Sequence, residues 1–341
     1  MLIGNNFSKY IRSRDEITIV GYYGMDNFGD DLMLKTLLDE FKKNNIKVNI
    51  LAYQKISWLS VSEYPNTKIW IWPESKIGKF KAFAQCISKS VGVFWGGGTC
   101  FTDEDGDGYF KYMVYTKLLM KKVGYIGVGI GNLNKFSRRV KTKILINISD
   151  VISFRDEKSL SKALNWKSHM SRCDIELVDD LANNTLESIV SEVSTSSHNE
   201  GNMVVAWRDL SNYSETTIGN NFNELANAII DLAKTFSIKK IILIDTDSEL
   251  DKKINLVLKG VLETKQESIS VVYNDSRSYK EKLNILNQGN LILTSRLHIA
   301  VAAKYLNKEC FVYDYSPKIK YFTEEENNRK IYLLNKDLSR L

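Results

Sequence analysis

The chain has 341 residues, of which 43% are hydrophobic and 26% charged, enough apolar material for the core of one large domain or two ordinary ones. Only 3 prolines occur and no long glycine- or serine-rich tract, which excludes collagen-like, mucin-like and repeat architectures. The net charge of +6 comes from 47 basic and 41 acidic residues spread along the chain. So mild an excess suits a small anionic substrate, or a loose attraction to an anionic membrane surface, and predicts no nucleic-acid partner.

The four cysteines form no CxxC pair, and we expect free, buried thiols in a reducing cytosol. They are Cys86, Cys100, Cys173 and Cys310. Residues Met1–Arg14 lack the apolar stretch of a signal peptide, and no apolar run is long enough to cross a bilayer. The sequence therefore predicts a cytoplasmic enzyme.

The first half of the chain alternates short apolar runs with amphipathic stretches. A helix is predicted over Asp31–Phe41, because Leu34, Leu37 and Leu38 recur on one face with Phe41. Strands this apolar on both faces are typical of a parallel sheet covered by helices. The predicted strands are Ile17–Val20, Lys47–Leu51, Lys68–Ile71, Val91–Trp95, Tyr125–Val128 and Val151–Phe154.

A polar stretch then interrupts the pattern and predicts a linker over 183–202, between an N-terminal α/β domain, 1–182, and a C-terminal one, 203–341. Two such halves predict an α/β fold of two Rossmann-like domains facing a central cleft, with ligands outside the carboxyl ends of the strands. The second half has predicted strands Met203–Trp207, Ile241–Ile244, Ile269–Tyr273, Leu291–Leu293 and Glu309–Tyr313, and helices Asn223–Phe236, Tyr279–Gln288 and Leu297–Tyr305.

The loop 21–31 follows the first strand and opens the first helix. It holds Gly24, Asn27 and Asp30, and its spacing is not the GxGxxG of dinucleotide loops. The carboxylates of Asp30 and Asp31 can satisfy the helix N-terminus themselves and would repel a phosphate. The loop either binds hydroxyl groups as part of the cleft floor or is a helix cap with a glycine turn, and the sequence favours neither.

Three consecutive glycines, 96–98, follow the strand that ends at Trp95. Their cost in backbone entropy favours a close approach of the backbone to a ligand or to the other domain, so Gly97, Gly98 and the nearby Asp103 are candidate cleft residues. The acidic run 103–107 lacks the spacing and terminal glutamate of an EF-hand, so we expect a solvated turn and no metal. Glycines in the segment 127–131 predict a tight turn.

Two arginines follow predicted strands. Arg155 comes after Val151–Phe154, where a structural contact with an aspartate explains it as well as catalysis does, and Asp156 or Ser159 can cap the next helix. Arg208 ends the first strand of the second domain. That is a cleft position, and it suits bidentate binding of an anion.

The segment Thr294–His298 again lies between a strand and a helix. Core packing is one explanation of His298, because apolar residues follow it. Its place at a strand end beside Arg296 favours a functional site instead. The other histidines, His169 and His198, lie in or near polar stretches and are expected at the surface.

In their order along the chain these motifs resemble the polysaccharide pyruvyl transferase family. The resemblance runs from about Ile17 to Lys318, and its most specific piece is S-R-L-H followed by a small-residue helix. The motifs are G-x-x-G-x-x-N-x-G-D at 21–30, the glycine-rich strand end at 96–98, G-V-G-I-G at 127–131, F-R-D-x-x-S at 154–159, S-R-L-H at 295–298 and a Y-x-P-K-like turn at 315–318.

The resemblance implies transfer of pyruvate from phosphoenolpyruvate to a sugar as a cyclic ketal across two hydroxyls, on a fold similar to two-domain GT-B glycosyltransferases. It also implies that Arg208, Arg296, Leu297 and His298 contact the donor. The chain departs from the family pattern at residues 25–26 and 99–100. Both departures fall in the first domain, so they bear on the acceptor more than on the donor.

The implied chemistry suits the residues. Phosphoenolpyruvate carries a phosphate and a carboxylate, and Arg208, Arg296 and Lys318 supply three cations at predicted strand ends. His298 is the expected general acid and base, because a group of near-neutral pKa suits protonation of carbon and deprotonation of hydroxyls. On the acceptor side its expected partner is Asp30 or Asp103.

Two other functions compete with this one. The first is a GT-B-type glycosyltransferase, in which the same cations hold the diphosphate of a nucleotide sugar. The second is a non-catalytic sugar-binding protein, against which the intact set of Arg208, Arg296 and His298 argues. No cofactor or metal is expected besides phosphoenolpyruvate as donor. The acceptor is expected to be a glycan or a lipid-linked sugar, with galactose, glucose and N-acetylmannosamine all compatible. A polyprenyl-linked precursor at the inner membrane face would suit the mild positive charge.

Overall fold

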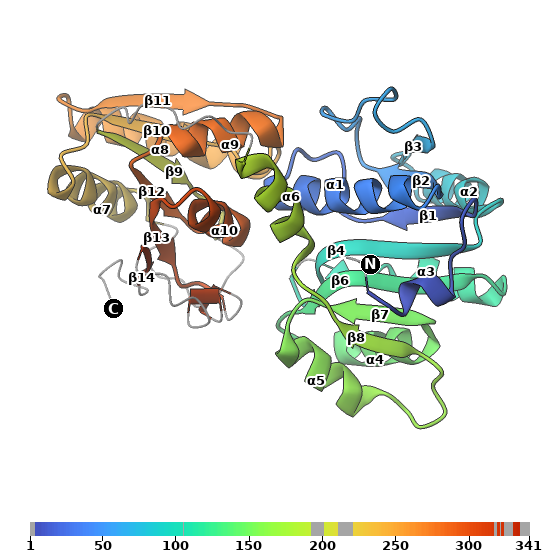
Figure 1. Cartoon of the computed structure of the whole chain (residues 1–341). Helices are drawn as coiled ribbons and strands as arrows, with labels where there is room; N and C mark the ends of the chain where they lie inside the picture. Colours follow the sequence, from blue (N-terminus) through green and yellow to red (C-terminus); the bar gives the residue numbers. More distant parts are fainter. Residues whose placement is uncertain are drawn as a thin grey trace. The chain divides into compact units, whose positions relative to one another are not determined.

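The computed structural model describes residues 4–104, 106–191, 201–210, 221–316, 319–320, 322–323 and 330–334. The chain folds into two compact units, drawn in Figure 1. The first unit comprises Met1–Met25 and Gly29–Thr185, and the second comprises Asp26–Phe28 and Leu186–Leu341. The linker predicted over 183–202 begins inside helix α6 (Leu181–Val190), and its part 192–200 lies outside the described residues.

The first unit is built on a sheet whose main strands run in the order β3–β2–β1–β4–β6–β7–β8, all pairing in parallel, while β5 pairs antiparallel with β4. Its strands are β1 (Glu16–Val20), β2 (Lys47–Ala52), β3 (Thr67–Ile71), β4 (Gly92–Thr102), β5 (Gly106–Asp107), β6 (Lys122–Ile130), β7 (Val151–Phe154) and β8 (Asp174–Leu177). Its helical segments are η1 (Phe7–Lys9), α1 (Phe28–Lys43), α2 (Lys76–Ile87), α3 (Phe110–Leu118), α4 (Phe136–Ile148), α5 (Glu157–Trp166) and the start of α6.

The parallel sheet confirms what the apolar runs predicted, since side chains on both faces of the central strands are buried. The sequence missed β8 because its alternating Asp174, Ile175 and Glu176 form a half-exposed edge strand with a weak apolar signal. The prediction of a turn over 127–131 was wrong, because β6 continues through Ile130 and only Gly131 lies beyond it. Gly127 lies inside β6, where an added Cβ would stand 2.7 Å from Leu181, so the glycine makes room for that side chain.

The second unit is also built on a parallel sheet, in the order β11–β10–β9–β12–β13–β14. The sequence missed β14, which follows a polar stretch, and the helix α8. The strands are β9 (Asn202–Ala206), β10 (Lys240–Ile244), β11 (Ser270–Asn274), β12 (Leu291–Thr294), β13 (Glu309–Tyr313) and β14 (Ile331–Leu334). The helices besides the end of α6 are α7 (Phe222–Thr235), α8 (Lys252–Lys265), α9 (Tyr279–Gln288) and α10 (Leu297–Tyr305).

Both sheets have the strand order of a Rossmann fold, which reverses direction at the first strand: β1 lies beside β4 in one sheet and β9 beside β12 in the other. Parallel crossovers share one hand, so the helices cover both faces of each sheet. In such sheets ligands bind outside the carboxyl ends of the strands at the point of reversal. Each unit therefore has one edge at which a site is expected.

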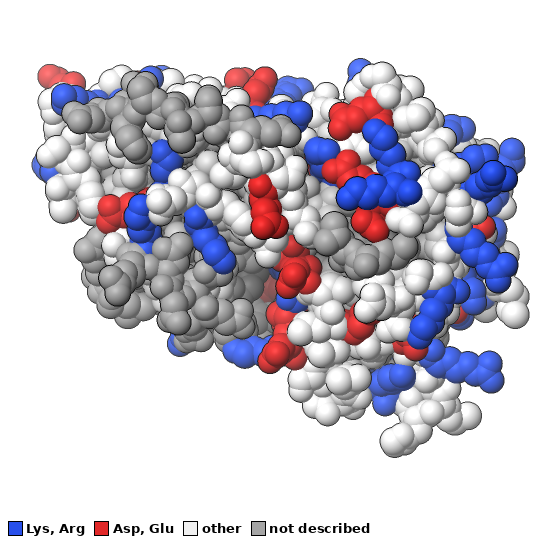
Figure 2. All heavy atoms as spheres, in the orientation of Figure 1, with Lys and Arg blue, Asp and Glu red and all other residues white. Residues whose placement is uncertain are grey.

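The charge of the chain is distributed rather than concentrated. On the described part of the face shown in Figure 2, basic and acidic side chains are interspersed and do not form one large basic patch. Within the part of the chain that the structure describes, no helix is both long and apolar enough to span a membrane.

Candidate active site

The reversal point of the second sheet brings two predicted site residues together. Arg208 follows β9 and Arg296 follows β12, and these strands are paired neighbours. The Arg208 backbone N–H donates to Ser295 Oγ at 2.9 Å, and the Ser295 N–H donates to the Ala206 carbonyl at 3.2 Å. Because Ser295 is fully buried, these bonds fix the two strand ends beside each other and hold both arginines at one edge of the sheet.

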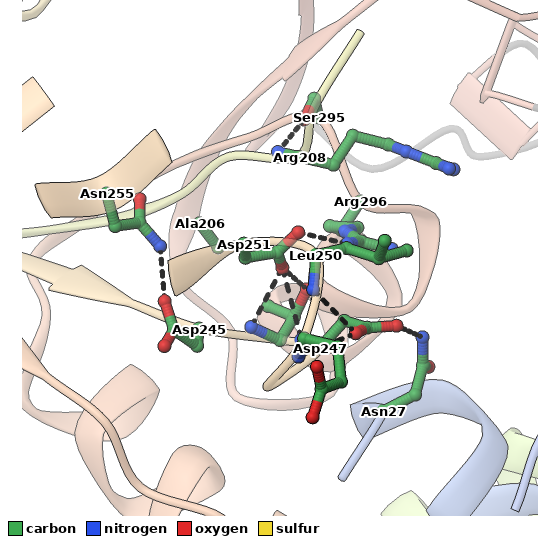
Figure 3. Close-up of polar contacts among 12 residues, drawn as sticks. Asn27, Ala206, Arg208, Asp245, Asp247, Leu250, Asp251, Asn255, Ser295 and Arg296 are labelled. Carbon is green, nitrogen blue, oxygen red and sulfur yellow. Dashed lines mark hydrogen bonds and ion pairs between the residues drawn. The ribbon is translucent and has the colours of Figure 1, made fainter. Parts of the chain in front are cut away.

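Arg296 is held by the buried carboxylate of Asp251, with which its Nη2 forms an ion pair (Figure 3). The other oxygen of Asp251 accepts hydrogen bonds from the Thr246 N–H at 3.0 Å, the Thr246 hydroxyl at 2.7 Å and the Asp247 N–H at 3.1 Å. These donors offset the cost of burying the charge. Arg296 Nε, in contrast, is buried and has no hydrogen-bond partner among the described residues. One edge of the guanidinium is fixed while Nε still requires an acceptor, as in a prepared anion site.

Asn27, from the first glycine loop, lies in the same network. It belongs with its two neighbours to the second unit, where the Phe28 N–H donates to the Thr246 carbonyl at 2.8 Å. The Asn27 side-chain amide donates to Asp247 Oδ2 at 3.2 Å (Figure 3). The sequence placed Asn27 among acceptor-side loops of the first domain. The structure places its side chain against the loop that positions Asp251.

A second buried carboxylate lies near this network, at the end of β10. Asp245 Oδ1 accepts from Asn255 Nδ2 at 2.7 Å, and Oδ2 accepts from the Tyr273 hydroxyl. Burial raises the pKa of Asp245, and the negative charge of Asp251 adds to that rise, while the two hydrogen bonds oppose it. Asp245 thus accepts hydrogen bonds from Asn255 and Tyr273, whereas Asp251 forms the ion pair with Arg296.

Leu297 and His298 form the first turn of α10, and the N-cap residue Arg296 makes no side-chain cap there. A helix N-terminus of this kind presents backbone N–H groups and the positive end of the helix dipole to an anion. Leu297 and His298 are half-buried, whereas the residues 299–303 that follow are buried in the core. Core packing is therefore the role of the residues after His298, while His298 is only half-buried as a residue, with Nε2 of its imidazole buried.

Arg208 is oriented from the neighbouring strand end. Its Nη1 donates to the Tyr315 hydroxyl at 3.1 Å, and the guanidinium carbon lies 5.6 Å from the centroid of the Tyr315 ring. Figure 3 shows the Arg208 side chain extending away from Asp251, so that carboxylate does not neutralise it. Buried polar atoms without a hydrogen-bond partner among the described residues also occur nearby, at Trp207 Nε1 and Ser316 Oγ. Lys318, the third predicted cation, lies outside the described residues.

The reversal point of the first sheet holds most of the predicted acceptor residues. At Gly97 (φ 77°) a Cβ would stand 2.5 Å from Met33 Sδ, and at Gly24 (φ 80°) one would stand 2.2 Å from a backbone oxygen. The close approach that the glycines 96–98 predicted is, at Gly97, packing within the unit, and Gly24 packs in the same way. At Gly98 (φ 78°) a Cβ would stand 3.4 Å from Asp30 Oδ1 and 3.8 Å from Met33 Cε, at ordinary contact distance, and the residue is half-buried.

Asp103 combines a structural contact with an unsatisfied one. Its Oδ2 accepts from the backbone N–H groups of Asn134 at 2.6 Å and Lys135 at 3.0 Å, just before α4. Its Oδ1 is buried and has no hydrogen-bond partner among the described residues. Oδ2 therefore fixes the segment before α4, and Oδ1 could still accept a hydrogen bond, for example from a hydroxyl group.

The other described acidic side chains of the run 103–107 form local contacts within the first unit. Asp107 pairs with Lys141 at 2.7 Å, and Glu104 accepts from Thr102 and, at 3.4 Å, from Asn132. Asp105 lies outside the described residues. Within the described chain no group of three or more His, Cys, Asp or Glu side chains could hold a metal ion.

Arg155 has a structural environment. Its Nη1 donates to Asp180 at 2.8 Å and its Nη2 to the Thr99 hydroxyl at 3.0 Å, and the side chain is 9% exposed. Asp156 caps α5 by accepting from the Ser159 N–H at 2.7 Å, as one of the two expected caps. Arg155 thus ties together β4, β7 and the loop before α6.

Sequence reasoning missed two residues that hold the arginines. Asp251 belongs to an acidic segment directly after the strand Ile241–Ile244, and that strand-end position was a signal available in the sequence. Tyr315 lies in the turn that was singled out for Lys318 alone. Its role depends on the pairing of β12 with β13, which the sequence does not reveal.

Comparison with known proteins gives a family. The family model described as polysaccharide pyruvyl transferase matches residues 27–317. That range includes Arg208 and the segment Thr294–His298; it begins inside the first glycine motif, at Asn27, and ends at Pro317, one residue before Lys318. Among curated proteins no significant match is found.

Solved structures share the fold at low sequence identity. UDP-GlcNAc 2-epimerase from Methanocaldococcus jannaschii is 12% identical with a TM-score of 0.65, over 94% of this chain and 89% of that one. The Neisseria meningitidis enzyme of the same name, bound to UDP-GlcNAc, is 13% identical with a TM-score of 0.61, over 91% and 85%. An S. aureus MnaA–UDP structure is 14% identical with a TM-score of 0.65, over 91% and 82%. The likeness supports two Rossmann-like domains of the GT-B type.

Proposed function

The chain belongs to the polysaccharide pyruvyl transferase family, and on that premise we propose that it moves pyruvate from phosphoenolpyruvate to two hydroxyls of one sugar. The donor carries its negative charge on a phosphate and a carboxylate. The observation that carries the proposal is the pair of guanidinium groups at neighbouring strand ends, Arg208 after β9 and Arg296 after β12, beside the uncapped N-terminus of α10. The phosphate and the carboxylate of the donor would each bind a guanidinium group at this edge of the sheet, where the positive end of the α10 dipole also favours negative charge.

In the proposed reaction the first hydroxyl oxygen bonds to the central carbon of the donor, and the methylene carbon gains a proton to become a methyl group. The second hydroxyl oxygen then bonds to the same carbon as the carbon–oxygen bond to phosphate breaks. The products are the cyclic ketal and inorganic phosphate, which takes the remaining proton. His298, half-buried in the first turn of α10, would pass these protons, and Arg296 would stabilise the departing phosphate.

On the acceptor side we propose that Asp30, Gly98 and Asp103, at the reversal point of the first sheet, bind the sugar. Asp103 Oδ1 has no hydrogen-bond partner among the described residues, and Gly98 is half-buried, with Asp30 Oδ1 at contact distance from where its Cβ would be. A carboxylate oxygen and backbone groups suit sugar hydroxyls. The acceptor proposed is a glycan or its lipid-linked precursor, and the scheme uses no metal or further cofactor.

The proposal predicts that His298→Ala loses turnover by at least about 100-fold, because a general acid and base typically contributes a factor of 10² to 10⁴. The purified protein is incubated with phosphoenolpyruvate and candidate glycans, and released phosphate and the pyruvyl adduct are measured by colorimetry and mass spectrometry. His169→Ala, which removes an exposed histidine, is the matched control and keeps wild-type turnover. Near-normal turnover of a folded His298→Ala protein would contradict the assignment.

The melting temperature of the protein with different ligands distinguishes pyruvyl transfer from the competing glycosyl transfer from a nucleotide sugar. A ligand that binds only the folded state raises the melting temperature, by an amount that grows with its concentration relative to Kd. Phosphoenolpyruvate is expected to stabilise the protein, and Arg296→Ala to abolish the shift. Stabilisation by UDP- or GDP-sugars, with none by phosphoenolpyruvate, would favour the glycosyltransferase instead.

A further inference from the structure

A pocket of about 390 Å³ opens in the first unit. Its lining comes from the segments after β2 and β3, from α2, β5, the turn before α3, α3 itself and α4, and includes Tyr53, Trp72, Lys79, Tyr109, Lys111 and Tyr112. The volume lies within the roughly 300–1,000 Å³ typical of ligand sites. None of the functions assigned above uses it.

Aromatic rings form the wall of this pocket. The ring of Trp72 lies 5.9 Å from that of Tyr109 and 5.3 Å from that of Tyr112, centroid to centroid. The hydroxyls of Tyr53 and Tyr109 share one hydrogen bond at 2.9 Å, so a second hydroxyl proton remains available to a ligand. Apolar ring faces with hydroxyls at their edges suit a sugar ring, which has C–H faces and a rim of hydroxyl groups.

The indole N–H of Trp72 adds a donor to the same wall. Trp72 is 7% exposed, and its Nε1 is buried without a hydrogen bond of normal geometry among the described residues. The Tyr109 hydroxyl is still near enough to the indole N–H for the indole to lower the pKa of Tyr109 slightly. Burial nevertheless raises the pKa values of Tyr109 and Tyr112 overall. These hydroxyls therefore stay protonated and act as hydrogen-bond donors rather than bases.

The rim of the pocket is basic. Lys141 is neutralised by Asp107 at 2.7 Å, but Lys79 has no carboxylate partner among the described residues. Lys111 lies over the Tyr112 ring, with Nζ 4.8 Å from its centroid, and also has no carboxylate partner in the described chain. Two ammonium groups without a carboxylate partner in the described part of the chain, beside an aromatic wall, favour a ligand that carries a negative charge.

Hydrogen bonds connect this pocket to the loops proposed to bind the acceptor. The Tyr53 N–H donates to the Tyr23 carbonyl, at 2.9 Å, in the loop of Gly24. On the other side, the Tyr109 ring lies 4.9 Å from that of Trp95, whose indole N–H donates to the Gly97 carbonyl at 2.7 Å. Residues that line the pocket therefore contact both loops, directly or through Trp95, within the same unit.

We propose that this pocket is a second acceptor subsite, which holds a sugar ring bearing an anionic group next to the sugar that receives the pyruvyl group. The inference rests on the proposed function for its role, but the pocket itself can be tested by binding alone. The negative group has two sources, a phosphate on the sugar, as at the end of a lipid carrier, or the carboxylate of a uronic acid. Both would be met by Lys79 and Lys111.

The binding experiment uses glucose 1-phosphate, glucuronic acid and neutral methyl glucoside as probes, without phosphoenolpyruvate. Binding is measured by calorimetry and by the change in tryptophan fluorescence. We expect the anionic sugars to bind at least about tenfold more tightly than the neutral one, because a charge-assisted hydrogen bond is worth that much or more. Whichever anionic probe binds more tightly identifies the source of the charge. Equal binding of all three, or no binding of any, would overturn the proposal.

The variants locate the site. Lys79→Gln and Lys111→Gln are each expected to weaken binding of the anionic probes roughly tenfold, and Tyr53→Phe to weaken all three probes. Lys76→Gln, an exposed lysine of α2 outside the pocket, is the control and leaves binding unchanged. Unchanged binding in all three pocket variants would place the ligand elsewhere.

Turnover separates this inference from the proposed function. With an anionic acceptor, Lys79→Gln is expected to raise the KM for the acceptor while the KM for phosphoenolpyruvate stays the same. If wild-type protein forms no pyruvyl adduct but still binds the anionic probes through Lys79 and Lys111, the proposed function fails and the sugar site stands. If adducts form while the pocket variants behave like wild type, the subsite fails alone.

Discussion

The Arg296 guanidinium is prepared for an anion by contacts on one side only. Asp251 fixes Nη2, and the Asp251 carboxylate is itself fixed by three donors from residues 246 and 247. Nε has no hydrogen-bond partner among the described residues, and a buried donor without a partner costs about 1–3 kcal/mol. A donor phosphate or carboxylate would remove that cost. Asp251 thus acts as a positioning residue, through Arg296.

Asp251→Asn tests this positioning. The amide keeps the shape of the carboxylate but loses its charge, so Arg296 is expected to lose its fixed orientation. The KM for phosphoenolpyruvate should rise about tenfold or more, which corresponds to about 1.4 kcal/mol, while the KM for the acceptor stays unchanged. Steady-state kinetics measure both constants.

The control for this variant is Asp231→Asn, which removes an exposed carboxylate on α7 of the same unit and leaves both constants at wild-type values. Circular dichroism verifies that each variant is folded, since losing one partner of a buried ion pair can also cost several kcal/mol of stability. An unchanged KM for phosphoenolpyruvate in folded Asp251→Asn would show that the ion pair does not orient the donor.

At the scale of secondary-structure elements, the helix N-termini differ in whether a side chain caps them. The starts of α2, α5, α7 and α9 are capped by their own side chains, from Ser75, Asp156, Asn221 and Ser278. These caps satisfy backbone N–H groups that a helix leaves unpaired. The start of α10, like those of α3, α4 and α8, has no cap from its N-cap side chain; it directly follows Arg296, at the end of the strand that pairs with β9. A capped start supports the fold, and an uncapped one at the reversal point is suited to a ligand.

The cap of α5 predicts a loss of stability. Asp156→Ala removes the bond to the Ser159 N–H and a second one, at 2.8 Å, from the Ser159 hydroxyl, which itself accepts from the Ile130 N–H at the end of β6. We expect the free energy of unfolding to fall by roughly 1–2 kcal/mol. Urea titration followed by circular dichroism measures it.

Glu157→Ala is the comparison for the cap, because Glu157 is exposed in the same helical turn. It should cost only a few tenths of a kcal/mol, the effect of one charge near the helix dipole. Equal losses in the two variants would mean that the first turn of α5 is stabilised by charge rather than by the cap.

At the scale of the whole molecule, the cysteines report how tightly both units are packed. Cys86, Cys100 and Cys173 lie in the first unit and Cys310 in the second, and all four are free and buried. Burial raises the pKa of Cys86 and Cys173 to about 12 and raises those of Cys100 and Cys310 as well. A raised thiol pKa keeps the neutral form as pH increases, and the neutral thiol is the unreactive one.

Native protein is therefore expected to react with a thiol reagent such as dithionitrobenzoate at only a small fraction of its four cysteines, at pH 8 and equally at pH 9. After unfolding in guanidinium chloride all four should react, because exposure restores the ordinary thiol pKa. Absorbance at the two pH values before and after unfolding gives the count. Rapid labelling of native protein would mean that at least one unit opens readily.

The sequence by itself determined the fold class and the donor motifs. Apolar runs long enough for strands, separated by amphipathic stretches, indicate parallel sheets whatever the contacts between elements turn out to be. The order of short motifs indicated the family, which the family model confirmed. The strand-end positions of Arg208 and Arg296 could be predicted because each directly follows an apolar run.

Only the tertiary structure decided what surrounds those residues. The pairing of β9 with β12 makes Arg208 and Arg296 neighbours although 87 positions separate the Arg208 N–H from Ser295, its partner. The same is true of Asp251 with Arg296, and of the aromatic pocket assembled from Tyr53, Trp72 and Tyr109. Contacts of this range depend on strand order, and strand order follows from the packing of every helix and strand together rather than from any local pattern.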